Sequence, residues 1–416
     1  MTEPKLRPAR RKTQRRWRIP PVLTQGSEVF EGLGVLHEVP GEGGVVLWQL
    51  LRDASLWAES APEIRPGLFH RRDPEPSALD ALPSELVSSA RDLQALSDPE
   101  RVAAACRTIA RWAEENALLA TALAFSQTSA FAEPMDPETA YDVARLARRR
   151  GEEARAETWY RRTVAVARQR GDWATYSRAF IGLGALHARR GNLGAARRFC
   201  MRAFRAANRN TLRELEGRAL HRLFSAAAET GQRREAVRLA REALASFGAG
   251  HPRTSRLALD VARHWVADGR FDRALPVLRA LLPRLDGTSL RLPALAELAR
   301  ASGGTGDADA FLDAWTQAWE VAREEPDAAP VRALLSLARG AAALGAWSKA
   351  ETAARHALRL ATERADPRGC RASESLLETI ARRAAPPRAA ETPEPAGAEA
   401  LAAELMRALR EAEPAR

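Results

Sequence analysis

Small apolar side chains recur along this chain at an interval of 37 to 40 residues, and a glycine marks each repeat. The six glycines are Gly151, Gly191, Gly231, Gly269, Gly306 and Gly345. Five positions after each stands an alanine, except in the fifth repeat, where Phe311 takes that place. A fixed period in this range, with an apolar helix on each side of a glycine turn, is typical of a solenoid of helical hairpins. We therefore predict an all-α fold of about six hairpins with helical caps.

Turn residues and changes of composition predict the boundaries of the other segments. Two Asp-Pro-Glu sequences, beginning at Asp98 and Asp136, are helix starts in which aspartate accepts hydrogen bonds from free amides and proline occupies the first turn. A short apolar helix is expected from Val45 to Glu59. The predicted segments are a basic arm expected to be disordered (1–21), an appendage with a linker (22–77), N-terminal capping helices (78–136), the repeats (137–364), a C-terminal capping helix (365–384), a linker (385–397) and an acidic amphipathic tail (398–416).

The segment 177–204 shows the repeat pattern most clearly. Its first helix carries Gly184 among larger apolar residues, and its second carries Ala196, Cys200 and Ala203. This pattern resembles the tetratricopeptide repeat (TPR) family, which places a small residue eighth in the first helix and alanines in the second. The other matching residues at the eighth position are Ala144, Ala262, Ala299 and Ala338, whereas Phe224 departs from it.

The resemblance covers about residues 137–364 and implies a right-handed superhelix. The repeat is longer than the family's usual 34 residues, and the proline expected near each repeat end is absent. Hairpins of this length are similar to those of bacterial regulators and signalling adaptors in the family.

The resemblance also implies a ligand-binding groove. In this family the second, fifth and ninth residues of each first helix point into a concave surface, and eight of the twelve second and ninth residues here are arginine. Guanidinium groups bind carboxylates or phosphates through paired hydrogen bonds, so such a groove suits an acidic peptide. The candidate groove residues are Arg145, Arg178, Arg218, His221, Arg256, Arg263, Arg300, Arg332 and Arg339. Arginine supplies nearly all positive charge in the chain, so composition alone also places some arginines at exposed helical positions.

The tail offers a ligand for that groove within the chain itself. Leu401, Leu405 and Leu409 stand four residues apart in a helix expected at 398–412, with glutamates between them. Such an acidic helix suits an arginine-lined groove, in its own chain or a neighbour's. Packing as one more capping helix is the alternative, and the sequence leaves both open.

Charge is concentrated at the N-terminus. The formal net charge is +11, and residues 1–19 contribute +7 of it. An arm of this kind binds polyanions such as nucleic acid or an anionic membrane surface, or serves only as a solubilising tail. Its candidate binding residues are Lys5, Arg7, Arg10, Arg11, Lys12, Arg15, Arg16, Trp17 and Arg18.

Catalytic, metal-binding and cofactor-binding motifs are not recognisable. The three cysteines lie far apart, the histidines show no ligand spacing, and no stretch of 18 apolar residues indicates a membrane span. Thr13–Trp17 resembles a twin-arginine signal but lacks the apolar stretch that must follow, which favours the cytoplasm. We therefore expect a non-enzymatic scaffold or adaptor that needs no cofactor and binds a protein or acidic peptide. The alternative is a nucleic-acid-associated regulator that uses the arm.

Overall fold

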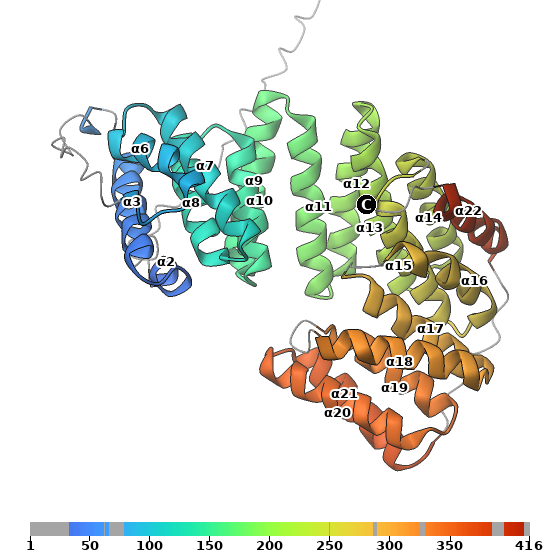
Figure 1. Ribbon diagram of the computed structural model, residues 1–416. Coiled ribbons are helices and arrows are strands. Elements are labelled where there is room, and N and C mark those ends of the chain that lie inside the picture. Colours follow the sequence, from blue (N-terminus) through green and yellow to red (C-terminus); the bar gives the residue numbers. More distant parts are fainter. Residues whose placement is uncertain are drawn as a thin grey trace, which may run out of the picture. The chain divides into compact units, whose positions relative to one another are not determined.

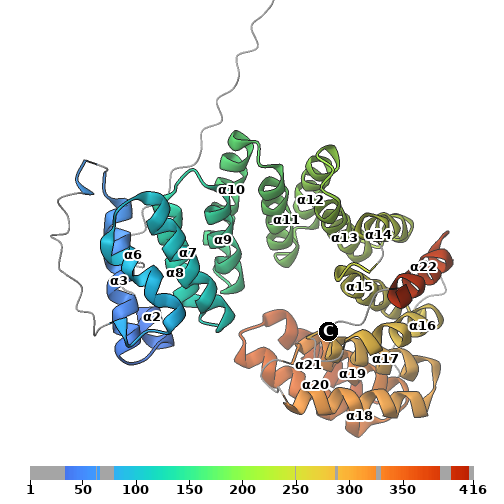
Figure 2. The same cartoon turned by 45° about the horizontal axis from the view of Figure 1, so that its top comes forward.

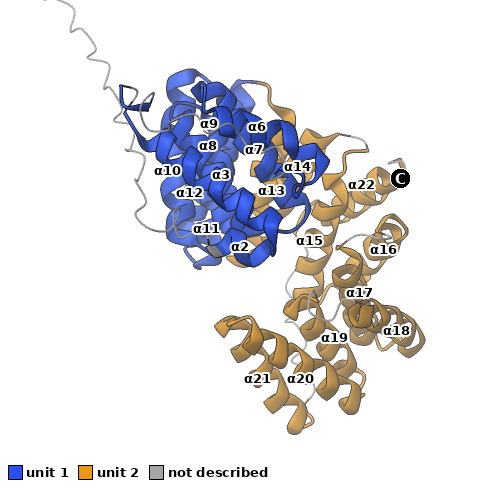
Figure 3. Ribbon diagram, turned by 60° about the vertical axis from the view of Figure 1, so that its left-hand side comes forward, with its two compact units in different colours: residues 1–210 blue, residues 211–416 orange. Residues whose placement is uncertain are grey.

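The computed structural model describes residues 33–61, 63–65, 79–248, 250–285, 289–324, 329–384 and 395–411. Within those ranges all regular structure is helical (Figure 1). The chain divides into two compact units, residues 1–210 and 211–416, and each is described by itself (Figure 3). The basic arm at 1–21 lies outside the described residues, so its predicted disorder and its binding residues stay predictions.

The described residues of unit 1 form three helical hairpins preceded by a smaller helical group. The hairpins are α7 (Pro99–Glu115) with α8 (Leu119–Ala132), α9 (Pro137–Arg149) with α10 (Glu153–Arg170), and α11 (Trp173–Arg189) with α12 (Leu193–Arg209). The preceding group comprises α2 (Leu33–Glu38), α3 (Glu42–Glu59), the 3-10 turn η1 (Ser84–Leu86) and α6 (Val87–Ala95). Helix α3 contains the predicted segment from Val45 to Glu59. Helix α8 packs against both α3 and α9, which joins the group to the hairpins.

In unit 2, the part of the chain that the structure describes forms four hairpins and two further helices. The hairpins are α13 (Arg213–Glu229) with α14 (Arg233–Phe247), α15 (Arg253–Ala267) with α16 (Phe271–Leu281), α17 (Arg291–Thr305) with α18 (Ala308–Glu324), and α19 (Val331–Ala343) with α20 (Trp347–Glu363). The 3-10 turn η2 (Leu282–Arg284) extends α16. Helix α21 (Pro367–Ala381) packs on α20, and α22 (Ala398–Glu411) packs on α14, α15 and α16 (Figure 2).

Each glycine of the predicted register lies between the two helices of a hairpin, with a backbone φ between 71° and 82°. A side chain at such a left-handed φ clashes with its own backbone, which is why glycine recurs there. The eighth-position rule has an equally direct cause at Gly184, where an added Cβ would lie 2.4 Å from Cys200 Sγ. The predicted all-α solenoid of stacked helical hairpins is confirmed.

The pair α7 and α8 is a hairpin that the glycine register did not reveal. Ala117 takes the left-handed conformation there, at φ 60°. The amide of Leu118 donates to Ala113 O at 2.7 Å, just as the amide of Glu152 donates to Ala147 O at 2.9 Å in the next hairpin. Ala117 therefore occupies the position that Gly151 occupies one repeat later, and a search for glycines passes over it.

Replacing Ala117 by glycine is expected to raise the free energy of unfolding by about 1 kcal/mol, because glycine adopts the left-handed conformation without strain. The matched change is Gly231→Ala. An added Cβ at Gly231 meets no atom within 4 Å, so only backbone strain acts, and a loss of about 1 kcal/mol is expected. Urea unfolding followed by helical circular dichroism measures both. Equal stability of Ala117→Gly and the parent chain would show that the α7–α8 turn is not strained.

Candidate functional site

The two candidate groove arginines of unit 1 are paired with carboxylates from neighbouring first helices. Arg145 on α9 donates from both terminal nitrogens to Glu114 on α7, with Nη2 to Oε2 at 2.6 Å. Hydrogen bonding from Arg145 lowers the pKa of Glu114. Arg178 on α11 forms an ion pair with Glu138 on α9, and its guanidinium lies 5.0 Å from the ring centre of Tyr141. Both arginines therefore cross-link α7, α9 and α11.

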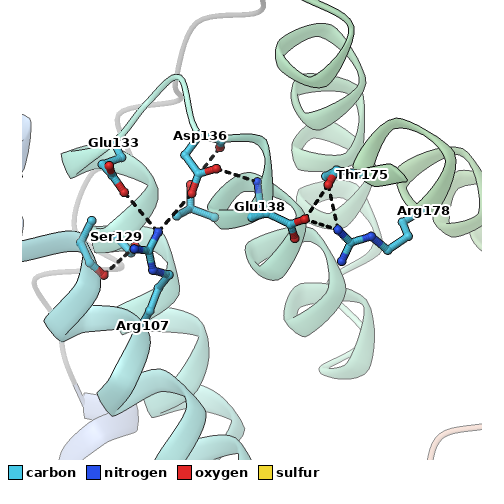
Figure 4. Close-up of polar contacts among 9 residues, drawn as sticks. Arg107, Ser129, Glu133, Asp136, Glu138, Thr175 and Arg178 are labelled. Carbon is cyan, nitrogen blue, oxygen red and sulfur yellow. Dashed lines mark hydrogen bonds and ion pairs between the residues drawn. The ribbon is translucent and has the colours of Figure 1, made fainter. Parts of the chain in front are cut away.

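A second set of contacts fixes Glu138 for that ion pair. Arg107 Nη1 donates to Glu133 Oε2 and to Asp136 Oδ2, each at 3.1 Å, and Asp136 in turn accepts from the amide of Glu138 at 3.1 Å (Figure 4). Thr175 Oγ1 donates to the Glu138 carboxylate at 2.6 Å. The start of α9 is thus held by charged contacts on both sides, and the two candidate arginines of unit 1 are neutralised in place.

In unit 2, three of the candidate groove residues surround one half-buried acid, Asp260. Asp260 on α15 accepts from His221 Nε2 on α13 at 3.0 Å, from Arg263 at 2.9 Å and from Arg256 at 3.3 Å. Burial favours the neutral acid, but the hydrogen bond and charge of His221, with the charges of both arginines, outweigh burial. They hold the pKa of Asp260 well below its usual range. Arg218 lies 3.7 Å from Glu214.

The same polar network continues across the next two first helices through Glu297 on α17. This side chain is only 2% exposed. Its Oε1 accepts from Arg263 Nε on α15 at 3.2 Å and from Ser336 Oγ on α19 at 3.0 Å. Four successive first helices, α13, α15, α17 and α19, are therefore linked by side-chain hydrogen bonds, and the arginines of this network already have anionic partners.

The last three candidates differ from the others. Arg300 on α17 and Arg332 and Arg339 on α19 form no hydrogen bond and no ion pair with any described residue. Burial lowers the pKa of Arg300. Burial also lowers the pKa of Arg339, and repulsion from Arg300 and Arg332 adds to that effect. These three residues, hereafter the arginine cluster, are neighbouring positive charges of which two are half-buried.

Glycines bring the two helices of the arginine cluster together. An added Cβ at Gly303 would lie 2.3 Å from Gly340 O, and one at Gly340 would lie 2.8 Å from Arg300 Cα. The backbones of α17 and α19 therefore approach closely at the level of Arg300 and Arg339. Small residues thus place two like charges side by side, and Glu297 is an acid whose charge favours the protonated form of both Arg300 and Arg339. One acid among three arginines leaves an excess of positive charge, which favours anion binding.

The sequence interpretation located the arginines but missed the acids that neutralise most of them. Asp142, Asp260 and Glu297 each follow a fifth-position residue directly, so they share the sixth position of the first helix. Comparing the sixth positions of the first helices between repeats would have shown these three acids. Glu114 was missed for another reason, because it lies in the hairpin whose turn has no glycine.

The tail helix does not occupy the predicted groove. Helix α22 packs on α14, α15 and α16, and its ion pairs are with Arg241 and Arg273, neither of which is a groove candidate. Of the two interpretations that the sequence left open, the structure shows a packed helix, which lies on both helices of the hairpin α15–α16 and on α14.

The described part of the chain contains no cluster of three or more histidine, cysteine and acidic side chains placed to hold a metal ion. Cys106 and Cys200 are free and buried. No helix among the described residues is long and apolar enough to cross a membrane.

No family model matches the chain, and no curated protein matches it. Similar solved structures include BtubC (BKLC) from P. vanneervenii, which is 18% identical, covers 56% of this chain and 94% of its own, and has a TM-score of 0.42. A Rap protein complexed with competence and sporulation factor is 10% identical over 85% of this chain and 98% of its own, with a TM-score of 0.46. The TPR domain of P58(IPK) is 14% identical; the match covers 81% of this chain and 79% of that domain, with a TM-score of 0.34. With TM-scores below 0.5, these distant likenesses carry no argument. The stack of helical hairpins is shown by the chain's own helices and their packing.

Proposed function

We propose that this chain is a non-enzymatic protein-interaction scaffold that binds an acidic peptide at the arginine cluster. The observation that carries the proposal is that Arg300, Arg332 and Arg339 form no hydrogen bond or ion pair with a described residue, whereas the other candidates contact carboxylates directly. Half-buried guanidinium groups that repel one another gain from a bound anion. The proposed binding surface is therefore narrower than the full series predicted from the sequence.

The arginine cluster is better suited to binding an extended or helical peptide than to catalysis. The arginine cluster lies on two packed helices, α17 and α19, and arginine binds carboxylates through two parallel hydrogen bonds. Such a rigid site supplies affinity and orientation, while guanidinium groups stay protonated and are poor acid–base catalysts. An acidic side chain of the peptide would lie between Arg300 and Arg339.

The test is the affinity of a fluorescein-labelled peptide of glutamate and leucine for the double variant Arg300→Glu with Arg339→Glu. Loss of two charged contacts of about 1.5 kcal/mol each predicts binding weaker by about 100-fold. The matched control is Arg198→Glu with Arg205→Glu, which makes the same charge change at exposed positions of α12. Fluorescence anisotropy measures both. Equal losses in the two double variants would show a general charge effect and contradict the proposed site.

The alternative from the sequence, a nucleic-acid-associated regulator, depends on the eight basic side chains within residues 1–19. Deleting residues 1–21 separates the two functions. Peptide binding that survives this deletion belongs to the arginine cluster, whereas salt-dependent binding of an oligonucleotide that disappears with it belongs to the arm. The cytoplasmic location stays a prediction of the sequence.

A further inference from the structure

Helix α22 packs on unit 2 through a single apolar stripe. Leu401, Leu405 and Leu409 are at most 1% exposed, and they face the surface formed by α14, α15 and α16. Figures 1 and 2 both show α22 beside α14 and α16. In the sequence, thirteen residues, 385–397, separate it from the segment 365–384.

Three arginines fix the direction and register of α22. Arg241 on α14 donates to both carboxylate oxygens of Glu404, at 3.0 and 2.5 Å. Arg273 on α16 lies 3.9 Å from Glu399 near the start of α22. Arg284 donates to the backbone carbonyl of Arg410 at 3.1 Å, where the helix dipole places partial negative charge. The surface therefore recognises an acidic helix whose leucines stand four residues apart.

The surface extends beyond the area that α22 covers. A surface cavity of about 700 Å³ lies between α14 and α22. Val237, Leu244 and Ala245 supply apolar lining, with basic side chains beside them. The complete lining is Arg234, Val237, Arg238, Arg241, Glu242, Leu244, Ala245, Ala396 and Glu404. An apolar strip with a positive rim complements the apolar stripe and negative rim of an acidic amphipathic helix.

We propose that the surface formed by α14, α15 and α16 is a second protein-binding site, which takes an acidic amphipathic helix from a partner protein in exchange for α22. The partner helix carries leucines at three positions four apart and a glutamate three residues after the first, as Leu401 and Glu404 do. Basic helices are excluded because Arg241 and Arg273 would repel them.

Exchange is favoured by the way α22 is held. The helix is anchored by one stripe of leucines, spaced about one helical turn apart, and by ion pairs between partly exposed side chains. The side chain of Arg241 is 45% exposed and that of Glu404 is 33% exposed. Exposed pairs of this kind contribute little to stability and mainly set specificity. Leaving the site requires no hairpin to unfold, because α22 is the last described helix of the chain and is joined through a linker. A tethered helix competes at an effective concentration in the millimolar range, which a tight partner overcomes.

The probe for this site is a fluorescein-labelled synthetic peptide of residues 395–411, added to full-length protein. The substitution Leu405→Asp in the protein undocks its own α22 by placing a charge in the buried stripe. We expect the peptide to bind this variant at least 10-fold more tightly than the parent chain, since the competitor has been removed. Circular dichroism and sizing confirm that the variant keeps its helical hairpins.

A charge exchange gives the specificity of the contact. Arg241→Glu, added to the Leu405→Asp protein, is expected to weaken peptide binding at least 10-fold, and the peptide with Glu404→Arg is expected to restore it. Absence of peptide binding to Leu405→Asp, or binding indifferent to Arg241→Glu, would overturn the proposal. Concentration-dependent dimers of the parent chain that vanish with Leu405→Asp would overturn the choice of a separate partner in favour of a second copy. Arg300→Glu with Arg339→Glu should leave this binding unchanged, so the two proposed sites fail independently.

Discussion

Replacing Gly303 by alanine is expected to lower the free energy of unfolding of unit 2 by about 3 kcal/mol. The added Cβ would lie 2.3 Å from the carbonyl oxygen of Gly340, 2.9 Å from its carbonyl carbon and 3.0 Å from its Cα. All three are backbone atoms, so no rotamer change relieves the overlap. Helices α17 and α19 would have to separate, which would loosen the packing of buried side chains such as Leu334 and Leu337.

Gly194→Ala is the matched control for this prediction. It lies at an exposed position near the start of α12, where an added Cβ meets only the Arg198 Nη1 atom, at 3.7 Å. This variant is expected to be unchanged or more stable by about 0.5 kcal/mol, because alanine loses less backbone entropy in a helix. Urea unfolding monitored by circular dichroism compares the two. A parent-like midpoint for Gly303→Ala would mean that α17 and α19 do not approach as closely as the structure shows.

The same substitution connects stability to the proposed ligand site. Separating α17 from α19 moves Arg300 away from Arg339, so any Gly303→Ala protein that remains folded should bind the acidic peptide more weakly. Gly194→Ala should not alter that binding.

The hairpins could be predicted because their turns impose a residue type. A left-handed φ excludes most side chains, so Gly151 and its counterparts keep a visible period whatever the neighbouring residues are. The rule is a tendency rather than a requirement. Ala117 adopts the same conformation at φ 60°, and the hairpin of α7 and α8 went unrecognised for that reason.

The repeat register alone could not predict which of the candidate arginines form ion pairs with acids of the chain. The register places Arg263 and Arg300 at the same position of consecutive first helices, and the sequence treats them alike. Only the structure shows that Glu297 Oε1 accepts from Arg263, on the preceding first helix, rather than from Arg300, three residues away on its own helix. Ion pairing depends on the rotation and spacing of packed helices, which a one-dimensional repeat does not specify.

The location of α22 was equally beyond the sequence. Its leucine stripe and glutamates are compatible with any apolar surface that has a basic rim, and this chain has arginines on many helices. The contacts with Arg241 and Arg284 depend on how α14, α16 and the turn after α16 are placed around α22. Composition therefore predicted an acidic helix that docks, while three-dimensional packing selected its site.

Replacing Asp260 by asparagine is expected to lower the free energy of unfolding of unit 2 by about 3 kcal/mol at pH 7. Asparagine has nearly the same shape, so the loss reports the charge. Without it, Arg256 and Arg263 would face each other and His221 with no acid between them, and the link from α13 to α15 would weaken. Glu374→Gln, at an exposed position of α21, is the control and should change stability by less than about 0.5 kcal/mol.

The pH dependence of that difference identifies its electrostatic origin. Contacts with His221, Arg256 and Arg263 hold the pKa of Asp260 in the folded protein below its ordinary value of 3.8, so the unfolded chain takes up the proton first as pH falls. The contribution of Asp260 is therefore fully present above about pH 5 and decreases as pH falls through 3.8 toward the lower folded-state pKa. Urea midpoints of the parent and Asp260→Asn proteins should thus converge on acidification. A gap that stays constant between pH 7 and pH 3 would instead assign the loss to altered packing, because shape does not titrate.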